Sequence, residues 1–305
     1  MNESRVIAVV VTYQPDGPAL ARLLQRLVPQ VQHTVVVDNT DESCRPLPPP
    51  PTGTVQTWLS LGRNTGIAHA QNLGVEHARQ LGATHVLFMD QDSLPPEGMV
   101  PQLLQSLTAA APDHRVAAIG PLCRDIKTGR ITPLIQRRGW RIQRVQAKGT
   151  APIPVEYIPA SGTLAALSAL DRVGLFRAEY FIDRVDVEWC LRARHLGMGI
   201  WVDPRCVMQH DQATRAVRLL GRTLYIGRDF RAYFHVRNSV AMAAHAAIAP
   251  FWRWDQIIKT LPYVVLYTLA ARHGRLHMAK TLLVAVCDGL RGRMGKGHYE
   301  SKPLR

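Results

Sequence analysis

The stretch HVLFMDQDS, residues 85–93, constrains the fold of this chain most strongly. Its apolar run Val86–Met89 contains β-branched and aromatic members and ends directly at two carboxylates, Asp90 and Asp92. Such a run is typical of a strand that is buried on both faces of a parallel sheet. Ligands of open α/β sheets bind at the carboxyl ends of the strands. The stretch therefore predicts a binding edge, although a solvated turn with a helix N-cap at Asp92 or Ser93 is the simpler alternative.

Strand and helix patterns alternate ahead of this stretch. Apolar, β-branched residues at 6–11 and 34–39, and a weaker set at 55–61, predict three further strands. Residues 18–31 carry leucines at helical spacing, and residues 62–82 form a loop that leads into a helix. This order of elements predicts an α/β fold with a doubly wound, mostly parallel sheet.

The sequence of the second half predicts a less regular order of strands and helices. The expected elements are a strand at 116–121, a hairpin within 123–150, a strand, turn and short helix within 155–176, a helix within 181–197, strands at 199–204 and 207–211, and helices from 231 to 290. A basic segment beyond residue 212, with Gly221 and Gly227, is expected to be a mobile loop. We therefore expect a catalytic domain over 1–215, followed by a loop and a basic helical segment over 216–305.

Basic residues are concentrated in the C-terminal third. The net charge of the 305-residue chain is +14, and residues 212–305 hold 16 Lys and Arg against 4 Asp and Glu. Residues 1–211 are nearly balanced, with 21 against 19. This asymmetry predicts an anionic partner surface, either nucleic acid or acidic lipid. The chain has no zinc-finger spacing and no RNA-recognition motif, and its basic part contains apolar helices, so we favour lipid.

Two further features bear on the environment of the chain. Its five cysteines are scattered without a C-x-x-C pair, which predicts free thiols in a reducing compartment. No stretch reaches about 18 uninterrupted apolar residues, so no transmembrane helix is expected. The N-terminus reads as a first strand and not as a signal peptide.

Carboxylates and one histidine are expected to meet at the binding edge. Asp38, Asp90 and Asp92 each follow a predicted strand, and His210 follows another. A divalent cation such as Mn²⁺ or Mg²⁺ binds carboxylate oxygens and substrate phosphate, and imidazole suits manganese. Asp92, His210 and a diphosphate would satisfy such an ion. Taken singly, Asp38 could equally cap a turn, and His210 could be an ordinary strand-end histidine.

Two more groups flank this edge. Arg63, Asn64, Gly66 and Asn72 lie in and after a loop that precedes a helix, where a backbone can approach a phosphate closely. The acids Asp183, Asp186 and Glu188 lie at the start of another helix. Their simpler explanation is a favourable interaction with the helix dipole, worth about 0.3–1 kcal/mol each.

Taken together, these motifs resemble family 2 glycosyltransferases, which have the GT-A fold. The matching stretches are VVVTYQPD (9–16), VVVDN (35–39), GRNTGIAHAQNLG (62–74), LFMDQDS (87–93), FIDRVDVEWCLRA (181–193), VDPRCVMQH (202–210) and YFHVRN (233–238). Within the family, the stretches DQDS (90–93) and 181–193 are most similar to those of bacterial rhamnosyltransferases that build cell-surface polysaccharide or glycolipid. The resemblance implies a Rossmann-like, mostly parallel catalytic sheet.

The resemblance also implies roles for residues that match the family motifs. Thr12, Tyr13 and Asp38 would hold the base and ribose of a nucleotide sugar, and Asn64 and Asn72 would lie beside the nucleotide and its diphosphate.

At the other side of the site, Asp90 would bind the donor, Asp92 and His210 would hold Mn²⁺ or Mg²⁺, and Asp186 would be the general base.

One departure from the family pattern keeps other bases open. The family usually has Glu-Asp-x-Asp, whereas this chain has Val185-Asp186-Val187-Glu188. Asp183 and Glu188 therefore stay as competitors for the base, and Arg237 stays as a further position that could contact the acceptor.

The chemistry of glycosyl transfer is consistent with these residues. A carboxylate can take the proton of an acceptor hydroxyl in the transition state, and a base opposite the leaving group implies inversion at the anomeric carbon. The implied donor is dTDP-β-L-rhamnose. Another nucleotide sugar, or a metal-dependent nucleotidyl- or phosphotransferase for which Asp186 is dispensable, stays an alternative. A nicotinamide dehydrogenase is disfavoured because VTYQPDG lacks the G-x-G-x-x-G motif.

The basic helical segment suits a membrane interface. Trp252 and Trp254 flank Arg253, and the apolar helical runs are interrupted by basic residues such as Lys259 and Lys280. The alternative is a helical subdomain that packs on the catalytic domain, and both can hold. We expect a cytoplasmic enzyme, peripheral at the inner face of the membrane, with a glycan or lipid-linked acceptor. The sequence leaves a homo-oligomer open.

Overall fold

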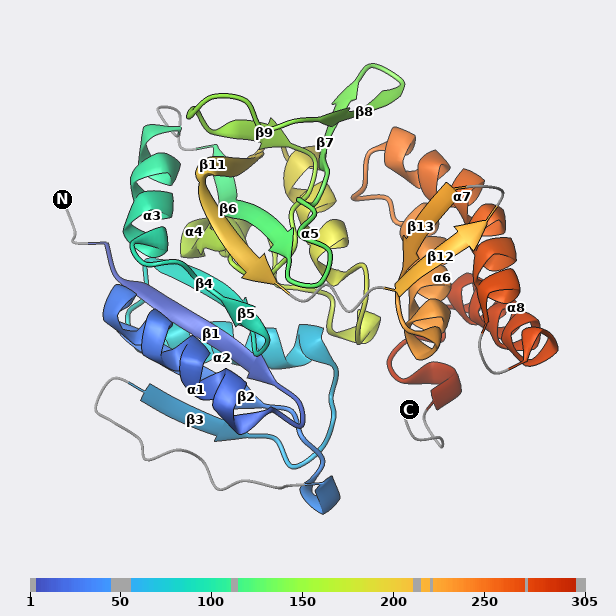
Figure 1. Cartoon of the computed structure of the whole chain (residues 1–305), viewed down its shortest axis with the longest axis horizontal. Helices are drawn as coiled ribbons and strands as arrows, with labels where there is room; N and C mark the ends of the chain where they lie inside the picture. Colours follow the sequence, from blue (N-terminus) through green and yellow to red (C-terminus); the bar gives the residue numbers. More distant parts are fainter. Residues whose placement is uncertain are drawn as a thin grey trace.

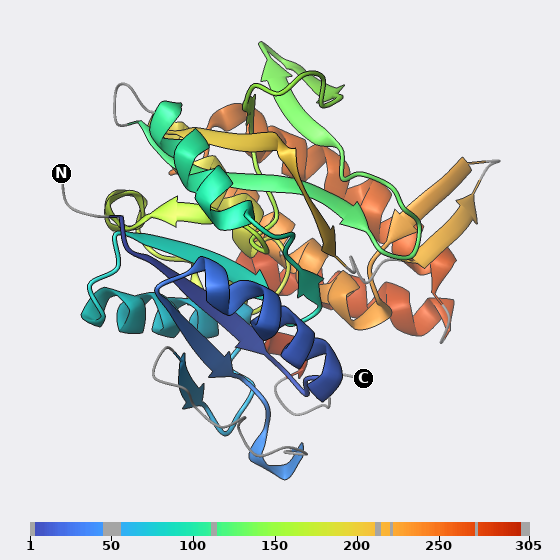
Figure 2. The same ribbon diagram turned by 60° about the vertical axis from the view of Figure 1, so that its left-hand side comes forward.

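The computed structural model describes residues 4–44, 56–110, 115–210, 215–219, 222–271 and 274–299, with the backbone alone at 215–219 and 222–225. A large sheet is covered by helices on both faces, and a group of C-terminal helices lies beside it (Figure 1). The same helices, in orange and red, gather at one side of the sheet in Figure 2.

The main sheet is mixed but mostly parallel. Its strands are β1 (Val6–Thr12), β2 (His33–Asp38), β3 (Gln56–Ser60), β4 (His85–Asp90), β5 (Ser93–Leu94), β6 (Val116–Asp125), β9 (Ile153–Val155), β10 (Leu164–Ala166) and β11 (Gly199–His210). Their order is β3-β2-β1-β4-β10-β6-β11-β5, with β9 paired to β11. The pairs among β1 to β4 and the pair β6–β11 are parallel, whereas β10 runs antiparallel between β4 and β6. The predicted fold class is confirmed.

The register of the first strands places the predicted acids on one edge. Thr12 lies opposite Asp38 on β2, and Val11 lies opposite Asp90 on β4. The interior of β4, from Val86 to Met89, is buried between its neighbours. The alternative of a helix N-cap at Asp92 or Ser93 is wrong, because Ser93 begins the short strand β5.

One face of the sheet is covered by α1 (Gly17–Leu27) and α3 (Met99–Ala109). Asp16 caps α1 by accepting a hydrogen bond from the amide of Ala19 at 2.8 Å. The helix is shorter than the expected 18–31, because the chain tightens into a 3-10 turn at Val28–Gln30, which contains Pro29. Helix α3 was not predicted, although its buried residues Met99, Val100, Leu103 and Leu107 have helical spacing.

The other face is covered by α2 (Ile67–Gln80), α4 (Leu167–Val173) and α5 (Val185–His195). Helix α2 packs closely on β1, since a Cβ at Gly74 would overlap the side chain of Val9. The predicted hairpin within 123–150 is present as β7 (Leu134–Arg138) and β8 (Arg141–Val145). Strand β11 runs through both strand-like stretches expected at 199–211.

Part of the segment expected to be a mobile loop is an antiparallel pair, β12 (Arg215–Leu219) and β13 (Arg222–Ile226). The expectation rested on glycine, but the β-branched and aromatic residues Val217, Thr223 and Tyr225 favour strands. Gly221 lies outside the described residues, as does most of the proline-rich stretch 44–53.

The C-terminal helices are α6 (Asp229–Ala244), α7 (Pro250–Ala270) and α8 (Arg275–Arg291), which confirms the helices predicted there. They enclose a third apolar core with members such as Tyr233, Phe234 and Leu282. Trp252 corrects one expectation: it is buried, and its indole nitrogen donates to Glu156 at 3.0 Å, so it packs against the catalytic body. The boundary at residue 215 between the catalytic domain and the C-terminal segment stays a prediction.

All five cysteines are free, as expected. Within the described ranges, no helix combines the length and the apolar character that crossing a membrane requires.

Candidate active site

Three side chains converge at the carboxyl end of β4. Asp90 ends this strand, Asp92 lies in the turn that follows, and His210 ends β11. Strand β5 pairs antiparallel with the end of β11, which sets His210 opposite Ser93. One ligand atom from each of Asp90, Asp92 and His210 lies within 4.8 Å of the others. The predicted metal-binding residues are therefore brought together, although they are separated by 118 residues of sequence.

Two serines hold this group in place. The amide of Asp90 donates to Ser161 Oγ at 3.0 Å, Ser161 Oγ lies 2.6 Å from Ser93 Oγ, and Ser93 Oγ lies 2.8 Å from His210 Nδ1. This chain of hydrogen bonds fixes the imidazole ring relative to the strand that carries Asp90. Ser161 was not singled out from the sequence, because nothing in its local pattern indicates that it reaches β4.

The electrostatics of the group fit a divalent cation. The pKa of Asp90 is raised to about 6, first by burial and then by repulsion from Asp92 and Asp186, while His210 and Arg231 oppose the shift. Positive charge between carboxylates relieves the repulsion that raises such a pKa. Two carboxylates and one imidazole also match the ligands that Mn²⁺ accepts, so the residues fit the expected metal.

Asp38 lies further along the same edge. Its buried carboxylate accepts hydrogen bonds from Thr12 Oγ1 and from the amide of Thr40, both at 3.1 Å. These bonds fix the Asp38 side chain at the carboxyl end of β2. We call Thr12, Asp38, Asp90, Asp92 and His210 the acidic rim.

Tyr13 and Asn64 flank the acidic rim. The amide and carbonyl of Tyr13 are both bound by the side chain of Gln91, at 2.7 and 3.1 Å, which ties the end of β1 to the turn after β4. Asn64 Oδ1 accepts from Asn39 Nδ2 at 3.2 Å and from the amide of Gly66 at 3.0 Å. Gln91, which the sequence does not single out, is therefore a structural partner of Tyr13.

Asn72 stands apart from this group. Its side-chain nitrogen donates to the carbonyl of Phe176 at 2.7 Å, and its side-chain oxygen accepts from the amide of the same residue at 3.0 Å. Both polar atoms of the side chain thus join α2 to the loop after α4. These contacts are structural, and the expected place of Asn72 beside the diphosphate stays a prediction.

Asp186 faces the acidic rim from the first turn of α5. Its carboxylate accepts from the amide of Val187 at 2.8 Å and from the amide of Ala160 at 3.3 Å. Burial raises its pKa, against the lowering effect of these two amides. Its charge in turn raises the pKa of Asp90, so the two carboxylates lie within electrostatic reach of each other. A raised pKa makes a carboxylate a stronger proton acceptor, as a general base requires.

Asp183 is a weaker candidate for the base. It lies 3.3 Å from His235 and 3.9 Å from Arg231. Burial alone would raise its pKa, but His235, Arg231 and Arg184 together hold that pKa well below the usual range. A carboxylate that is so strongly paired is a poor proton acceptor.

The side chains of Glu188 and Arg237 are buried and take part in contacts that stabilise the fold. The Glu188 side chain is fully buried and pairs with Arg192 at 2.7 Å and with Arg177 at 3.4 Å. Arg237 is fully buried and donates to the carbonyls of Gly295 and Tyr180 at 2.6 and 2.9 Å. These contacts disfavour Glu188 as the base and Arg237 as a contact to the acceptor, and both roles stay predictions.

We compared the chain with protein families and with known proteins. No family model matches the chain. The dTDP-rhamnosyl transferase RfbF of Shigella flexneri is 28% identical over 300 residues, which is 98% of this chain and 99% of that protein. The relationship therefore extends over both the catalytic sheet and the C-terminal helices.

Solved structures show the same fold. TarS of S. aureus superimposes with a TM-score of 0.57 at 12% identity, over 94% of this chain and 49% of that one. GalNAc-T7, solved with UDP, GalNAc and Mn²⁺, gives a TM-score of 0.54 at 12% identity over 89% of this chain, which spans 58% of the GalNAc-T7 chain.

The chain is a glycosyltransferase with the GT-A fold.

The C-terminal helices of this glycosyltransferase hold the loop ahead of Asp186. The side-chain nitrogen of Asn238, on α6, donates to the carbonyls of Tyr180, Ile182 and Asp183 at 3.1, 3.0 and 2.7 Å. In the same loop, Phe181, Asp183 and Arg184 have φ between 63° and 68°, a region that side chains other than glycine rarely adopt. Asn238 thus stabilises a strained turn that sets the start of α5.

The same loop contacts the start of α2. Gly66, with φ of 87°, is the residue before this helix, and a Cβ there would lie 2.6 Å from Phe181. The amide of Ile67 donates to the carbonyl of Phe181 at 2.7 Å. Gly66 therefore allows the loop that carries Phe181 and the loop before α2 to pack together.

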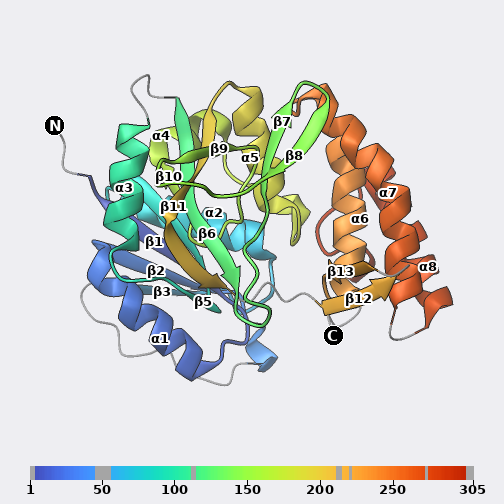
Figure 3. The same ribbon diagram turned by 45° about the horizontal axis from the view of Figure 1, so that its top comes forward.

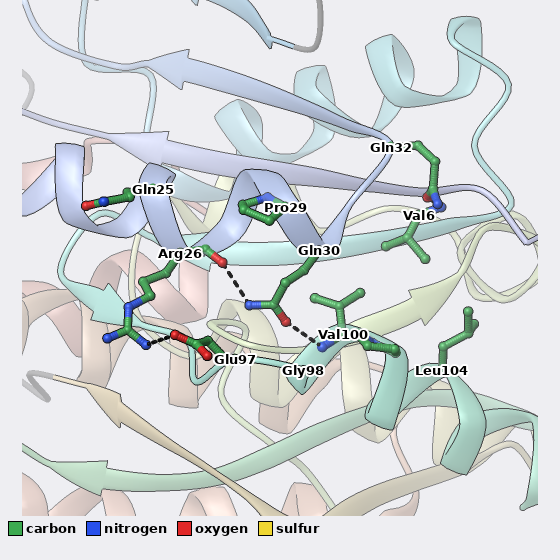
Figure 4. Close-up of a pocket in the computed structure, with 11 residues that line it drawn as sticks. Val6, Gln25, Arg26, Pro29, Gln30, Gln32, Glu97, Gly98, Val100 and Leu104 are labelled. Carbon is green, nitrogen blue, oxygen red and sulfur yellow. Dashed lines mark hydrogen bonds and ion pairs between the residues drawn. The ribbon is translucent and has the colours of Figure 1, made fainter.

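A pocket of about 530 Å³ lies elsewhere, between α1 and α3 (Figure 4). It is lined by Val6, at the start of β1, and so lies at the sheet edge opposite the acidic rim. The Gln30 side chain there is held by the carbonyls of Arg26 and Pro96 and by the amide of Val100. The residues that line this pocket include none of the acidic rim.

Proposed function

We propose that this chain is an inverting, metal-dependent glycosyltransferase that moves L-rhamnose from dTDP-β-L-rhamnose to a cell-surface polysaccharide or glycolipid acceptor. The observation that carries the proposal is the convergence of Asp90, Asp92 and His210 beside Asp186. The choice of donor rests on the similarity to RfbF over nearly the whole chain.

In this proposal, Asp92 and His210 hold Mn²⁺ or Mg²⁺, and Asp90 orients the donor. Such an ion, when bound, supplies positive charge that stabilises a departing nucleoside diphosphate. Asp186 accepts the proton of the acceptor hydroxyl while that oxygen attacks the anomeric carbon. Because the base and the leaving group lie on opposite faces of the sugar, one displacement inverts the configuration.

Thr12, Tyr13 and Asp38 bind the base and ribose of the donor in the same proposal, and Asn64 lies beside the nucleotide. A UDP-sugar is the competing donor, because TarS has been solved with UDP-GlcNAc. A nucleotidyl- or phosphotransferase would not need Asp186 and is the less supported alternative.

The proposed location is the cytoplasmic face of the membrane, with the protein bound peripherally. Lipid-linked acceptors would be met there, and the +12 net charge of residues 212–305 favours anionic lipid. Nucleic acid is not a proposed partner.

Thermal shift tests the donor class. With Mn²⁺ present, dTDP should raise the melting temperature more than UDP, GDP or CMP. A ligand at about 100 times its Kd adds roughly 2.7 kcal/mol of stability, which such a scan detects. Stronger stabilisation by UDP would replace dTDP-rhamnose by a UDP-sugar.

A further inference from the structure

Helix α7 carries an exposed apolar stripe. Trp254, Ile258 and Leu261 are 57%, 68% and 69% exposed. The stripe continues with Ile257, Val265 and Leu269, and α8 exposes Leu276, Leu283, Val284 and Leu290. The intervals along α7 return to one side of the helix, while Gln256 and Tyr267 are buried on the other side. Soluble monomers rarely expose contiguous apolar surface of this extent without a partner.

A second exposed segment meets the start of α7. Trp140, in the turn between β7 and β8, is 75% exposed, and its ring lies 5.7 Å from that of Phe251 in an edge contact. The guanidinium of Arg137 lies 5.4 Å from the centre of the same Phe251 ring. In Figure 3 the β7–β8 hairpin reaches the first turns of α7. The hairpin turn and the stripe therefore adjoin, although they are more than 100 residues apart in sequence.

The charges around this surface are almost all positive. Arg137, Arg138, Arg141 and Arg144 are exposed on the hairpin. Exposed basic residues of α8 and the following turn are Arg275, Lys280, Arg291 and Arg293.

Acidic residues on these helices are internally paired. Of the described residues from 250 to 299, two are acidic: Asp255 pairs with Lys259 at 2.7 Å, and buried Asp288 accepts from Tyr233 at 2.7 Å. The surface thus combines apolar and aromatic side chains with uncompensated positive charge.

Two partners could cover the apolar stripe: a second copy of the chain, which is basic, or an anionic bilayer. A second copy of the chain, docked through the same face, would bring two positively charged surfaces together, which is unfavourable. An anionic bilayer would neutralise them and would also accept the apolar and aromatic side chains.

We propose that the α7 stripe and the β7–β8 turn together form the surface that docks this enzyme on an anionic lipid bilayer. This rests on the proposed peripheral location and names the part of the protein responsible, including a hairpin in the catalytic half of the chain. Trp140, Trp254, Ile258 and Leu261 enter the interface between headgroups and acyl chains, while Arg138 and Arg141 contact lipid headgroups.

Flotation with vesicles tests the proposal, using the full chain. Vesicles of equal parts phosphatidylcholine and phosphatidylglycerol should bind the wild type at low salt, and pure phosphatidylcholine should bind it much less. The double variant Arg138→Gln/Arg141→Gln should partition roughly 30-fold more weakly, which corresponds to the attraction that two surface arginines contribute. The double variant Ile258→Ser/Leu261→Ser should lose at least roughly tenfold.

The matched control is Arg22→Gln/Arg172→Gln, which removes the same charge from exposed sites on α1 and α4. It should bind vesicles nearly as well as the wild type. Equal loss in the control and in the hairpin variant would overturn the assignment of the surface, because net charge alone would then explain binding.

Two other outcomes would also overturn the proposal. One is wild-type protein that stays unbound at low salt. The other is a concentration-dependent dimer that the Ile258→Ser/Leu261→Ser variant dissociates without any change in vesicle binding. The dTDP thermal shift, measured on each variant, should be unchanged, so a failure of docking is distinguished from a failure of the proposed donor.

Discussion

Replacing Asp90 by asparagine tests the electrostatic character of the acidic rim. Burial, Asp92 and Asp186 raise the pKa of Asp90 from 3.8 to about 6. A carboxyl group whose pKa is higher in the folded protein than in the unfolded chain stabilises the fold while it is protonated. That contribution is complete below about pH 4 and is lost as the pH rises through about 6.

Asparagine is nearly isosteric with the protonated carboxyl group and stays uncharged. A shift of roughly two pKa units corresponds to about 3 kcal/mol, and partial exposure of Asp90 makes this an upper limit. The metal-free Asp90→Asn protein should therefore be more stable than the wild type at pH 7.5, by up to about 3 kcal/mol, and the difference should vanish near pH 4. Urea unfolding in EDTA at both pH values measures it.

Asp171→Asn is the control, because Asp171 is an exposed carboxylate paired with Arg79 on the surface. It should change stability by less than about 0.5 kcal/mol. Mn²⁺ should stabilise the wild type more than the Asp90 variant, because the variant removes one negative charge beside Asp92 and His210. A wild type that is as stable as Asp90→Asn in EDTA at pH 7.5 would refute the claim that burial and the neighbouring carboxylates disfavour a charged Asp90.

Four further substitutions separate the roles of individual residues. Asp186→Asn should lower turnover by about 10²–10⁴-fold with dTDP affinity kept, since only proton transfer is lost; retained turnover would move the base elsewhere. Asp92→Ala should abolish the Mn²⁺-dependent thermal shift while circular dichroism is unchanged, and a persisting shift would argue against this ligand. Asn238→Leu removes the donor from the carbonyls of Ile182 and Asp183, while the carbonyl of Tyr180 keeps Arg237 as a donor. Urea unfolding should therefore show a loss of roughly 2–6 kcal/mol, and turnover per folded molecule should also fall. Glu188→Gln should weaken the buried pair with Arg192 and lower stability, whereas full stability with dead catalysis would restore Glu188 as the base.

The sequence predicted the sheet and its binding edge because these depend on local patterns. The run Val86–Met89 is buried and ends at Asp90, and Asp38 lies on the same edge because adjacent parallel strands end together. The position of β10, antiparallel between β4 and β6, was not predictable from these patterns. A three-residue strand carries too little periodicity to indicate its neighbours.

Contacts between distant segments account for the other differences between the structure and the predictions from the sequence. From the sequence, Trp252 is interpreted as an interfacial residue beside Arg253, yet it is buried, and its indole N–H donates a hydrogen bond to Glu156, 96 residues earlier. Asn72 lies in a family-like motif, but Phe176 engages both of its polar atoms. Ser161 reaches the acidic rim only because its turn folds back over β4. In each case the partner lies on a different element, and sequence spacing carries no information about it.

Turnover of dTDP-β-L-rhamnose is the most direct measurement of the proposed function. Purified protein with this donor and Mn²⁺ should release dTDP slowly by hydrolysis and faster when a suitable glycan or lipid-linked acceptor is added. EDTA or Asp92→Ala should abolish the release, and the rhamnosylated product should have inverted anomeric configuration. Release of dTDP at the same rate in EDTA, or a product with retained configuration, would contradict the proposed mechanism.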